Sequence, residues 1–362
     1  MQSKSRSTST SASKAPPTCR SSARSRSLTR SVTLASAAAL VSSAFVVAGG
    51  PGTAGASTPT AATAVTPTAS APCGTGATAP TTYTHVALIM FENKPLKKIV
   101  GNTTDAPYLN SLIKACSYSK NDLSLSTTSL TNYIALTSGY KGCKTADSNG
   151  ACTSELEITS NKDTTVWPQA SKSLFELMGN DAVEWAESMT TNCQLKGSGD
   201  FVINHTPFQY YTRTQATLCK ANARPFPANP ADALSARFNL IVPNKPHIMH
   251  LVPNTTVSQR IQNGDNWAKV FIPQLLSSPA YQSGNTAIII TWDEGNGSNF
   301  YVPLIVITPS TQAGGVSSVA YNHYSVLKGI QQMVGSASPL LGHAGDAGVS
   351  SIRDDAAFVL KP

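Results

Sequence analysis

Three short apolar runs constrain the fold of this chain more than any other feature of its sequence. They read HVALIMF at 85–91, TAIIIT at 286–291 and PLIVIT at 303–308. A short, continuous run of this kind is typical of a strand that is buried on both faces. The sequence therefore predicts that at least these three segments are strands of a central sheet.

Stretches with helical character lie between and after these runs, at 106–116, 130–136, 267–276 and 324–334. The alternation favours an α/β fold with a mostly parallel sheet and helices on both faces. Residues 83–362 contain no long polar break and no internal repeat, so we expect one large domain, or a core with insertions, there.

The first 56 residues have the pattern of a signal peptide. Residues 1–30 contain seven of the chain's 27 Lys and Arg residues and no acidic residue, and an apolar run at 31–48 leads to Ala54-Gly55-Ala56. We expect cleavage near Ala56 and secretion. A membrane anchor is the alternative, but Ala and Ser dilute the run, so we expect no membrane span after processing. The Thr-, Ala- and Pro-rich segment 57–82 predicts a disordered linker.

The net charge of +8 belongs mostly to this leader. The remaining 20 Lys and Arg residues nearly balance the 19 Asp and Glu residues of the whole chain. A nearly neutral mature protein offers no basic surface for nucleic acid.

Six cysteines remain once Cys19 leaves with the signal peptide. An even number in an exported chain predicts three disulfides. The sequence alone permits many pairings, but two of them close short loops, Cys143 with Cys152 and Cys193 with Cys219, which leaves Cys73 for Cys116. A zinc cluster fits these wide spacings poorly.

Polar side chains follow two of the predicted strands. Glu92 and Asn93 come after the first, and Asp293 and Glu294 after the second. In open α/β sheets, ligands bind beyond the carboxyl ends of the strands. Carboxylate and amide oxygens that converge there suit a divalent cation, so these residues predict a metal site.

A hydroxyl-rich segment precedes the second helical stretch. It reads STTSLTNY from Ser126 to Tyr133, and small hydroxyl residues in this position are typical of a helix start. A hydroxyl at the positive end of a helix and beside a metal is also a candidate nucleophile. We therefore interpret Ser129 as the nucleophile and Asn132, one turn later, as a donor to phosphoryl oxygens.

Five segments, in this order, give the chain its resemblance to the phosphoesterase family of bacterial acid phosphatases and phospholipases C, in the alkaline phosphatase superfamily. They are FEN at 91–93, SLTNYIALTSG at 129–139, NHTPF at 204–208, TWDEG at 291–295 and NHYSVL at 322–327. The resemblance implies an alkaline-phosphatase-like fold and a phosphoserine intermediate. It implies that Glu92, Asn93, Ser129, Asp293 and Glu294 hold metal, and that His205 and His323 line the phosphate pocket beside Asn132.

Two departures from the family pattern concern this site. Thr127-Thr128 stand where members commonly have His-Pro, and residues 255–260 replace a segment that often contains Asp and His. His247 or His250, just upstream, is the candidate to take over a polar role.

The sequence therefore predicts a secreted, metal-dependent phosphomonoesterase that acts on a small-molecule or lipid phosphoester. A phosphodiesterase of the phospholipase C type uses the same nucleophile and metal and is the first alternative. A secreted binding protein with decayed catalytic machinery is the second. No G-x-S-x-G elbow surrounds any serine, which argues against an ordinary serine hydrolase.

Overall fold

The computed structural model describes residues 65–250 and 252–362. The predicted signal peptide 1–56 and the first part of the predicted linker lie outside the described residues. Among the described residues, no helix combines the length and the apolar character needed to span a bilayer.

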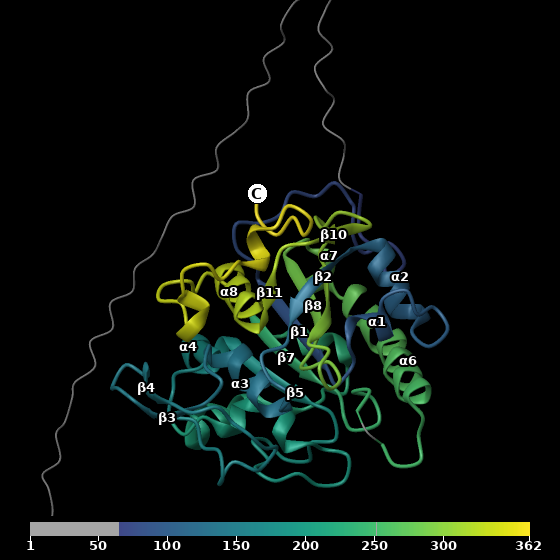
Figure 1. Cartoon of the computed structure of the whole chain (residues 1–362). Helices are drawn as coiled ribbons and strands as arrows, with labels where there is room; N and C mark the ends of the chain where they lie inside the picture. Colours follow the sequence, from purple (N-terminus) through teal and green to yellow (C-terminus); the bar gives the residue numbers. More distant parts are fainter. Residues whose placement is uncertain (1–64, 251) are drawn as a thin grey trace, which may run out of the picture. The chain divides into compact units, whose positions relative to one another are not determined.

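A nine-stranded sheet forms the centre of the domain (Figure 1). Its strands lie in the order β10-β2-β9-β8-β1-β7-β5-β6, and β11 also pairs with β2. Their bounds are β1 His85–Phe91, β2 Ser117–Leu123, β5 Ala182–Ala186, β6 Ala223–Pro225, β7 Phe238–Val242, β8 Thr286–Trp292, β9 Tyr301–Ile307, β10 Gly315–Ser317 and β11 Tyr321–Asn322. Every pairing is parallel except those of β9, which runs antiparallel to β2 and β8. The predicted mostly parallel sheet is confirmed.

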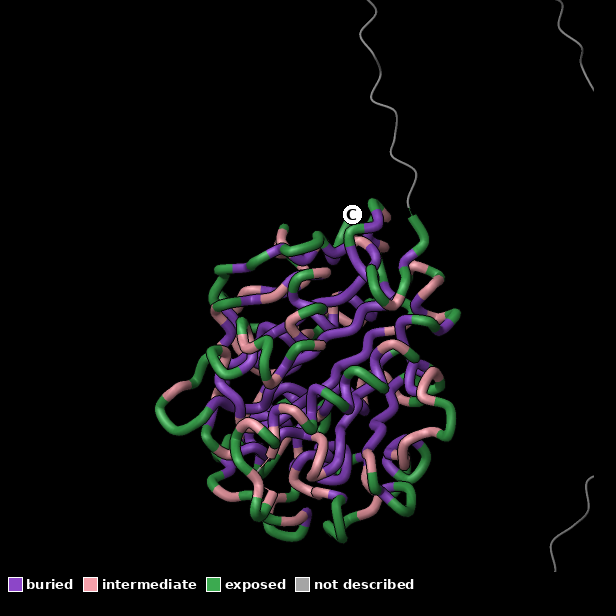
Figure 2. Tube along the Cα trace, turned by 90° about the vertical axis from the view of Figure 1, so that its right-hand side faces the viewer, coloured by how far each residue is buried: buried purple, intermediate pink, exposed green. Residues whose placement is uncertain are grey.

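Alternate residues of the central strands face two separate cores. On β1, Val86, Leu88 and Met90 belong to one core and Ala87, Ile89 and Phe91 to the other. The first core packs against α3 (Ser129–Ser138), α4 (Leu174–Met178) and α8 (His323–Met333), and the second against α2 (Pro107–Ala115), α6 (Val257–Leu276) and α7 (Pro279–Gln282). Side chains alternate between the faces of a strand, so a strand with no polar position must be covered on both. Buried backbone runs through the middle of the domain in Figure 2.

The predicted elements agree closely with the observed ones. The three apolar runs are β1, β8 and β9, and three of the helical stretches are α2, α3 and α8. The fourth is only the second half of α6, which begins earlier because Thr256 and Gln259 form a capping box at its start. Two further short helices are α1 (Leu96–Ile99) and α5 (Lys220–Asn222).

Part of the predicted linker differs from expectation. Residues 65–82 lie against the domain, because a disulfide joins Cys73 to Cys116 and hydrogen bonds fix the neighbouring backbone. The Gly74 amide donates to Thr311 O over 2.8 Å, and the Tyr281 hydroxyl donates to Pro72 O over 2.8 Å. The disulfide therefore holds in place a segment that contains few apolar residues with which to pack against the domain.

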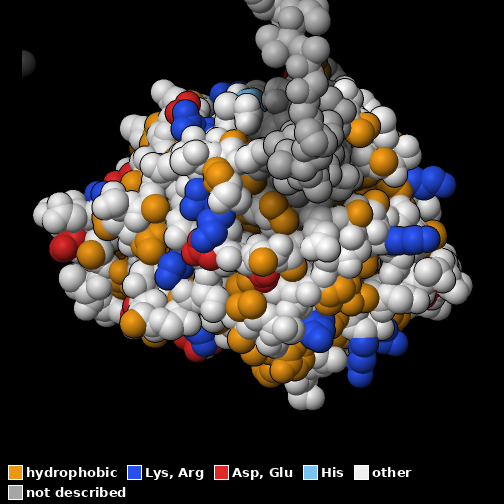
Figure 3. Space-filling view, turned by 90° about the horizontal axis from the view of Figure 1, so that it is seen from above, with side chains coloured by type: hydrophobic (Ala, Val, Ile, Leu, Met, Phe, Trp, Pro, Cys, Tyr) orange, Lys and Arg blue, Asp and Glu red, His pale blue; other side chains and the backbone are white. Residues whose placement is uncertain are grey.

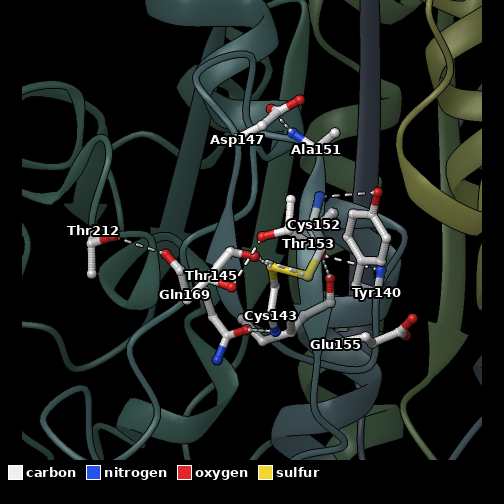
Figure 4. The surroundings of a disulfide bond; sticks show 12 residues. Tyr140, Cys143, Thr145, Asp147, Ala151, Cys152, Thr153, Glu155, Gln169 and Thr212 are labelled. Carbon is white, nitrogen blue, oxygen red and sulfur yellow. Dashed lines mark hydrogen bonds between the residues drawn. A yellow bond between two sulfur atoms is a disulfide. The ribbon is translucent and has the colours of Figure 1, made fainter.

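The other two disulfides are the short-loop pairs expected from the sequence, Cys143–Cys152 and Cys193–Cys219. The first joins the two strands of a small hairpin, β3 (Cys143–Ala146) and β4 (Cys152–Glu155). Figure 4 shows that Gln169 accepts from the Cys143 amide, over 2.8 Å, and from the Thr212 hydroxyl through its backbone oxygen. The hairpin is thus attached to the segment that follows it.

His343 connects this hairpin to the C-terminal part of the chain. Its Nδ1 lies 2.7 Å from Asp346 Oδ2 and its Nε2 lies 3.0 Å from Glu155 Oε2. Both partners are carboxylates, which accept, so the fully bonded form is the imidazolium. Partial burial lowers the pKa of His343, but the hydrogen bonds to Glu155 and Asp346 outweigh this and raise the pKa above its usual value.

Replacing His343 with Gln is expected to reduce stability in acid but not in base. A pKa raised by folding gives stability that is fully present below the unfolded pKa and is lost as the pH rises through the folded one. His343 is more than one third exposed, so we expect a loss of under about 1 kcal/mol. Thermal melts at about pH 5 and about pH 9 measure it. A difference between the proteins that grows with pH would contradict this assignment.

Candidate active site

The ends of β1 and β8 bring the first acidic residues together. These strands are neighbours and parallel, with Phe91 paired to Trp292, so Glu92 and Asp293 follow side by side. Continued alternation places both on the side of the sheet that α3 and α8 cover. A fixed strand register therefore accounts for the convergence of two residues that are 201 positions apart in the chain.

Three carboxyl groups share this buried volume. Glu92 and Asp293 are fully buried and Glu294 is 8% exposed. Asp293 Oδ1 accepts from the backbone amides of Asn93, over 3.0 Å, and Glu294, over 2.6 Å. Asp293 Oδ2 is buried and has no hydrogen-bond partner among the described residues.

The electrostatics of this group are unfavourable without a cation. Burial raises the pKa of Asp293 well above its usual value, and the charges of Glu92 and Glu294 raise it further. Burial, with Glu92, also raises the pKa of Glu294 to about 8. Close carboxylates cannot all ionise in a dry site unless a positive charge is present. Their arrangement, with an unpartnered oxygen, fits a divalent cation.

Two histidines contact Glu92. His205 Nε2 pairs with Glu92 Oε1, and His250 Nδ1 lies 2.5 Å from Glu92 Oε2. One ligand atom of each of these three residues lies within 4.8 Å of the others, a spacing that a metal ion can occupy. Burial raises the pKa of Glu92, but the two imidazoles outweigh it and hold the pKa below its usual range.

His205 is fixed on its other side by α3. It lies on the short helix η2 (Ile203–His205) and stacks on Tyr133, with ring centroids 5.4 Å apart. The His205 side chain is 1% exposed. This contact joins the helix that carries Ser129 and Asn132 to the Glu92 side of the site.

His323 begins α8 and is fully buried. Its Nε2 lies 2.6 Å from Asp293 O, and because a carbonyl only accepts, Nε2 carries the proton. Burial lowers the pKa of His323 to about 4, so the ring is neutral near pH 7. His323 therefore contacts the acidic group through the backbone oxygen of Asp293. The Nδ1 atom of His323 has no hydrogen-bond partner among the described residues.

Asn132 links the start of α3 to the acidic strand end. Its Oδ1 accepts from the amides of Leu125 and Ser126, over 3.0 and 3.1 Å. Its Nδ2 donates to Ser126 O over 2.9 Å and lies 3.4 Å from Glu294 Oε2. The side chain thus shapes the turn before α3 as well as reaching Glu294.

Ser129 is the first residue of α3 and is 1% exposed. Its Oγ accepts from Asn161 Nδ2 over 3.5 Å. A cavity of about 180 Å³ opens beside Glu294, and its lining includes Asn93, Ser126 and Thr127. Thr127 lines this cavity, and Ser129 is not among its lining residues.

Lys94 is a residue of this region that the sequence did not single out. It is 5% exposed, and its Nζ donates to Met249 O over 2.6 Å and to Asn93 O over 3.1 Å. Burial lowers the pKa of Lys94 to about 8. The ammonium ties the end of β1 to the loop that carries His250. The sequence offers no periodic signal for such a contact, because it joins two loops.

The structure thus brings four predicted metal ligands, Glu92, Asn93, Asp293 and Glu294, into one group of contacts and connects Asn132 and His205 to it. It adds His250, which also lies 3.1 Å from Asn93 Nδ2. The sequence had proposed His250 only as a substitute of undefined role. Its place beside Glu92 depends on the loop after β7, which the sequence pattern does not specify.

Comparison with known proteins gives one family match. The model of the Phosphoesterase family matches residues 103–335. The chain is 24% identical over 278 residues to a phosphatidylinositol-3-phosphatase of Mycobacterium tuberculosis, covering 76% of this chain and 84% of that protein.

Solved structures of similar architecture share less sequence. A protein of the alkaline phosphatase superfamily from Vibrio parahaemolyticus has a TM-score of 0.48 at 11% identity, over 74% of this chain and 70% of that chain. The lipoteichoic acid synthase LtaP from Listeria monocytogenes has a TM-score of 0.46 at 11% identity, over 74% of this chain and 75% of that chain.

Proposed function

The chain belongs to the Phosphoesterase family and is a phosphoric ester hydrolase, and from this premise we propose that it is a secreted, metal-dependent phosphomonoesterase with Ser129 as its nucleophile. The observation that supports the metal part is the buried set of three carboxyl side chains, in which Asp293 Oδ2 has no hydrogen-bond partner in the described part of the chain. The predicted signal peptide and the three disulfides support export.

The residues that would hold the cation are Glu92, Asn93, Asp293 and Glu294, with Ser129 as a further ligand and His205 and His250 beside Glu92. A divalent cation bound there supplies a Lewis acid that favours the ionised serine and offsets charge on the phosphoryl group. The donor set is dominated by oxygen, with imidazole at one side, which both hard and borderline cations accept.

The proposed reaction proceeds in two halves. Ser129 Oγ loses its proton to solvent and bonds to phosphorus, the ester P–O bond breaks, and His205, which contacts Glu92, gives a proton to the leaving oxygen. Water then adds to phosphorus and gives a proton back to His205. The bond between Ser129 and phosphorus breaks, and Ser129 regains a proton as inorganic phosphate leaves.

The small cavity beside Glu294 supports a compact phosphoryl group as the part of the substrate that is bound. Its volume of about 180 Å³ lies below the roughly 300–1,000 Å³ typical of sites that enclose a drug-sized ligand. A compact phosphoryl group fits such a space, while the remainder of the substrate stays outside. The preference for a phosphomonoester rests on the relative's printed name, a phosphatidylinositol-3-phosphatase.

We expect the full chain, incubated with Mg²⁺, Mn²⁺, Ca²⁺ or Zn²⁺ in turn, to release nitrophenol from p-nitrophenyl phosphate at least about tenfold faster than from p-nitrophenylphosphorylcholine. Faster release from the diester would favour the phospholipase C type of activity. Binding of metal or phosphate without turnover of either substrate would favour the decayed binding protein. A scan of pH with each cation completes the measurement.

A further inference from the structure

The start of α3 lacks a capping side chain of its own. Thr128 occupies the N-cap position but makes no side-chain cap hydrogen bond. The first amides of a helix have no partner within the helix and need an acceptor from elsewhere. Here Asn161, from the segment between β4 and α4, accepts from the Leu130 amide through Oδ1 over 3.0 Å.

The side-chain amide of Asn161 also reaches the Ser129 hydroxyl. Asn161 Nδ2 donates to Ser129 Oγ over a long 3.5 Å. The side-chain amide of Asn161 is planar. The hydrogen bond from the Leu130 backbone N–H to Asn161 Oδ1 therefore also fixes the direction of Asn161 Nδ2. We propose that Asn161 is a positioning residue for Ser129: it fixes the serine rotamer and donates to Oγ as negative charge develops there. This inference rests on the proposed role of Ser129.

The segment that carries Asn161 is held on α3 and on the neighbouring core. Thr131 Oγ1 donates to Ile158 O over 2.6 Å, and the Tyr210 hydroxyl donates to Lys162 O over 2.7 Å. Ile158 is 1% exposed and belongs to the core on the α3 side. Contacts on both sides of Asn161 therefore limit where its side chain can lie, although the residue itself is exposed.

A donor aimed at the nucleophile has a defined chemical effect. It stabilises the ionised oxygen relative to the hydroxyl, and it leaves the hydroxyl proton free to point away from Asn161. Loss of one such donor at a reacting oxygen costs about a hundredfold to a thousandfold in other enzymes. The bond here is long, so we expect a loss of about tenfold to a hundredfold in kcat.

Two substitutions separate this role from simple capping. Asn161→Asp keeps an acceptor for the Leu130 amide but loses the donor, and a carboxylate near a helix start is favourable. Asn161→Ala loses both the acceptor and the donor without adding charge. We expect both variants to lose kcat by about tenfold to a hundredfold with KM changed by less than about threefold, whereas only Asn161→Ala melts at a lower temperature.

Asn149→Asp is the matched control, because it adds the same charge at another exposed Asn, in the turn between β3 and β4. It is expected to keep the full kcat. If both Asn161 variants keep kcat within about twofold while Ser129→Ala is inactive, Asn161 is only a helix cap and the inference fails. Loss in Asn161→Asp alone would show an effect of added charge and would also overturn it. If Ser129→Ala itself stays active, the proposed function fails first.

Discussion

Ser129→Ala is expected to lower kcat/KM for p-nitrophenyl phosphate by at least about a thousandfold, because it removes the oxygen that forms the covalent bond to phosphorus. Ser129 is buried at the start of α3, so the lost hydroxyl exposes no surface and leaves the helix intact. The thermal midpoint should therefore change little. Quenching the reaction in acid with ³²P-labelled substrate should leave label on the wild-type protein and none on the variant.

Thr128→Ala is the control for this substitution. Thr128 is the preceding residue, it also carries a hydroxyl, and it makes no side-chain cap hydrogen bond. Its removal should leave kcat within about threefold. Thr127 is the rival nucleophile, because it lines the cavity beside Glu294. Retained activity in Ser129→Ala, combined with loss of activity and label in Thr127→Ala, would move the nucleophile to Thr127.

The central sheet was predictable because its signal is local. Apart from His85, β1 and β8 contain only apolar residues and Thr, and a short continuous run of this kind is typical of a buried strand. β2, with the sequence SYSKNDL, carried no such signal. It is a strand because β9 and β10 pair with it on either side, and pairing partners are a property of the tertiary fold.

The candidate site was predictable to the extent that strand ends define it. Glu92 and Asp293 follow adjacent parallel strands, so their meeting is a consequence of the fold class. The contacts of His250, Lys94 and Asn161 come from loops, whose paths depend on packing that no periodic pattern encodes. Sequence reasoning therefore pointed to the acidic residues at the strand ends, named His250 only as a substitute of undefined role, and did not point to Lys94 or Asn161.

Asp293→Asn is expected to abolish metal-dependent activity, lowering kcat/KM by at least about a thousandfold, while leaving the metal-free protein as stable as the wild type or more so. Burial and the charges of Glu92 and Glu294 raise the pKa of Asp293, so its ionised form destabilises the fold above the pKa of the unfolded chain. Asparagine removes that charge and keeps an oxygen for the amides of Asn93 and Glu294.

Thermal melts with and without cation, alongside metal content, separate the two effects of this substitution. A ligand that binds only the folded state stabilises it by about 2.7 kcal/mol at a hundred times its dissociation constant. Wild type should gain this stability on addition of metal, and Asp293→Asn should not.

Asp122→Asn is the control, since burial raises the pKa of Asp122 to about 8 and its carboxyl is already mostly protonated near pH 7. Equal stabilisation of wild type and Asp293→Asn by metal would show that the cation binds without Asp293, and the proposed ligand set would then be wrong.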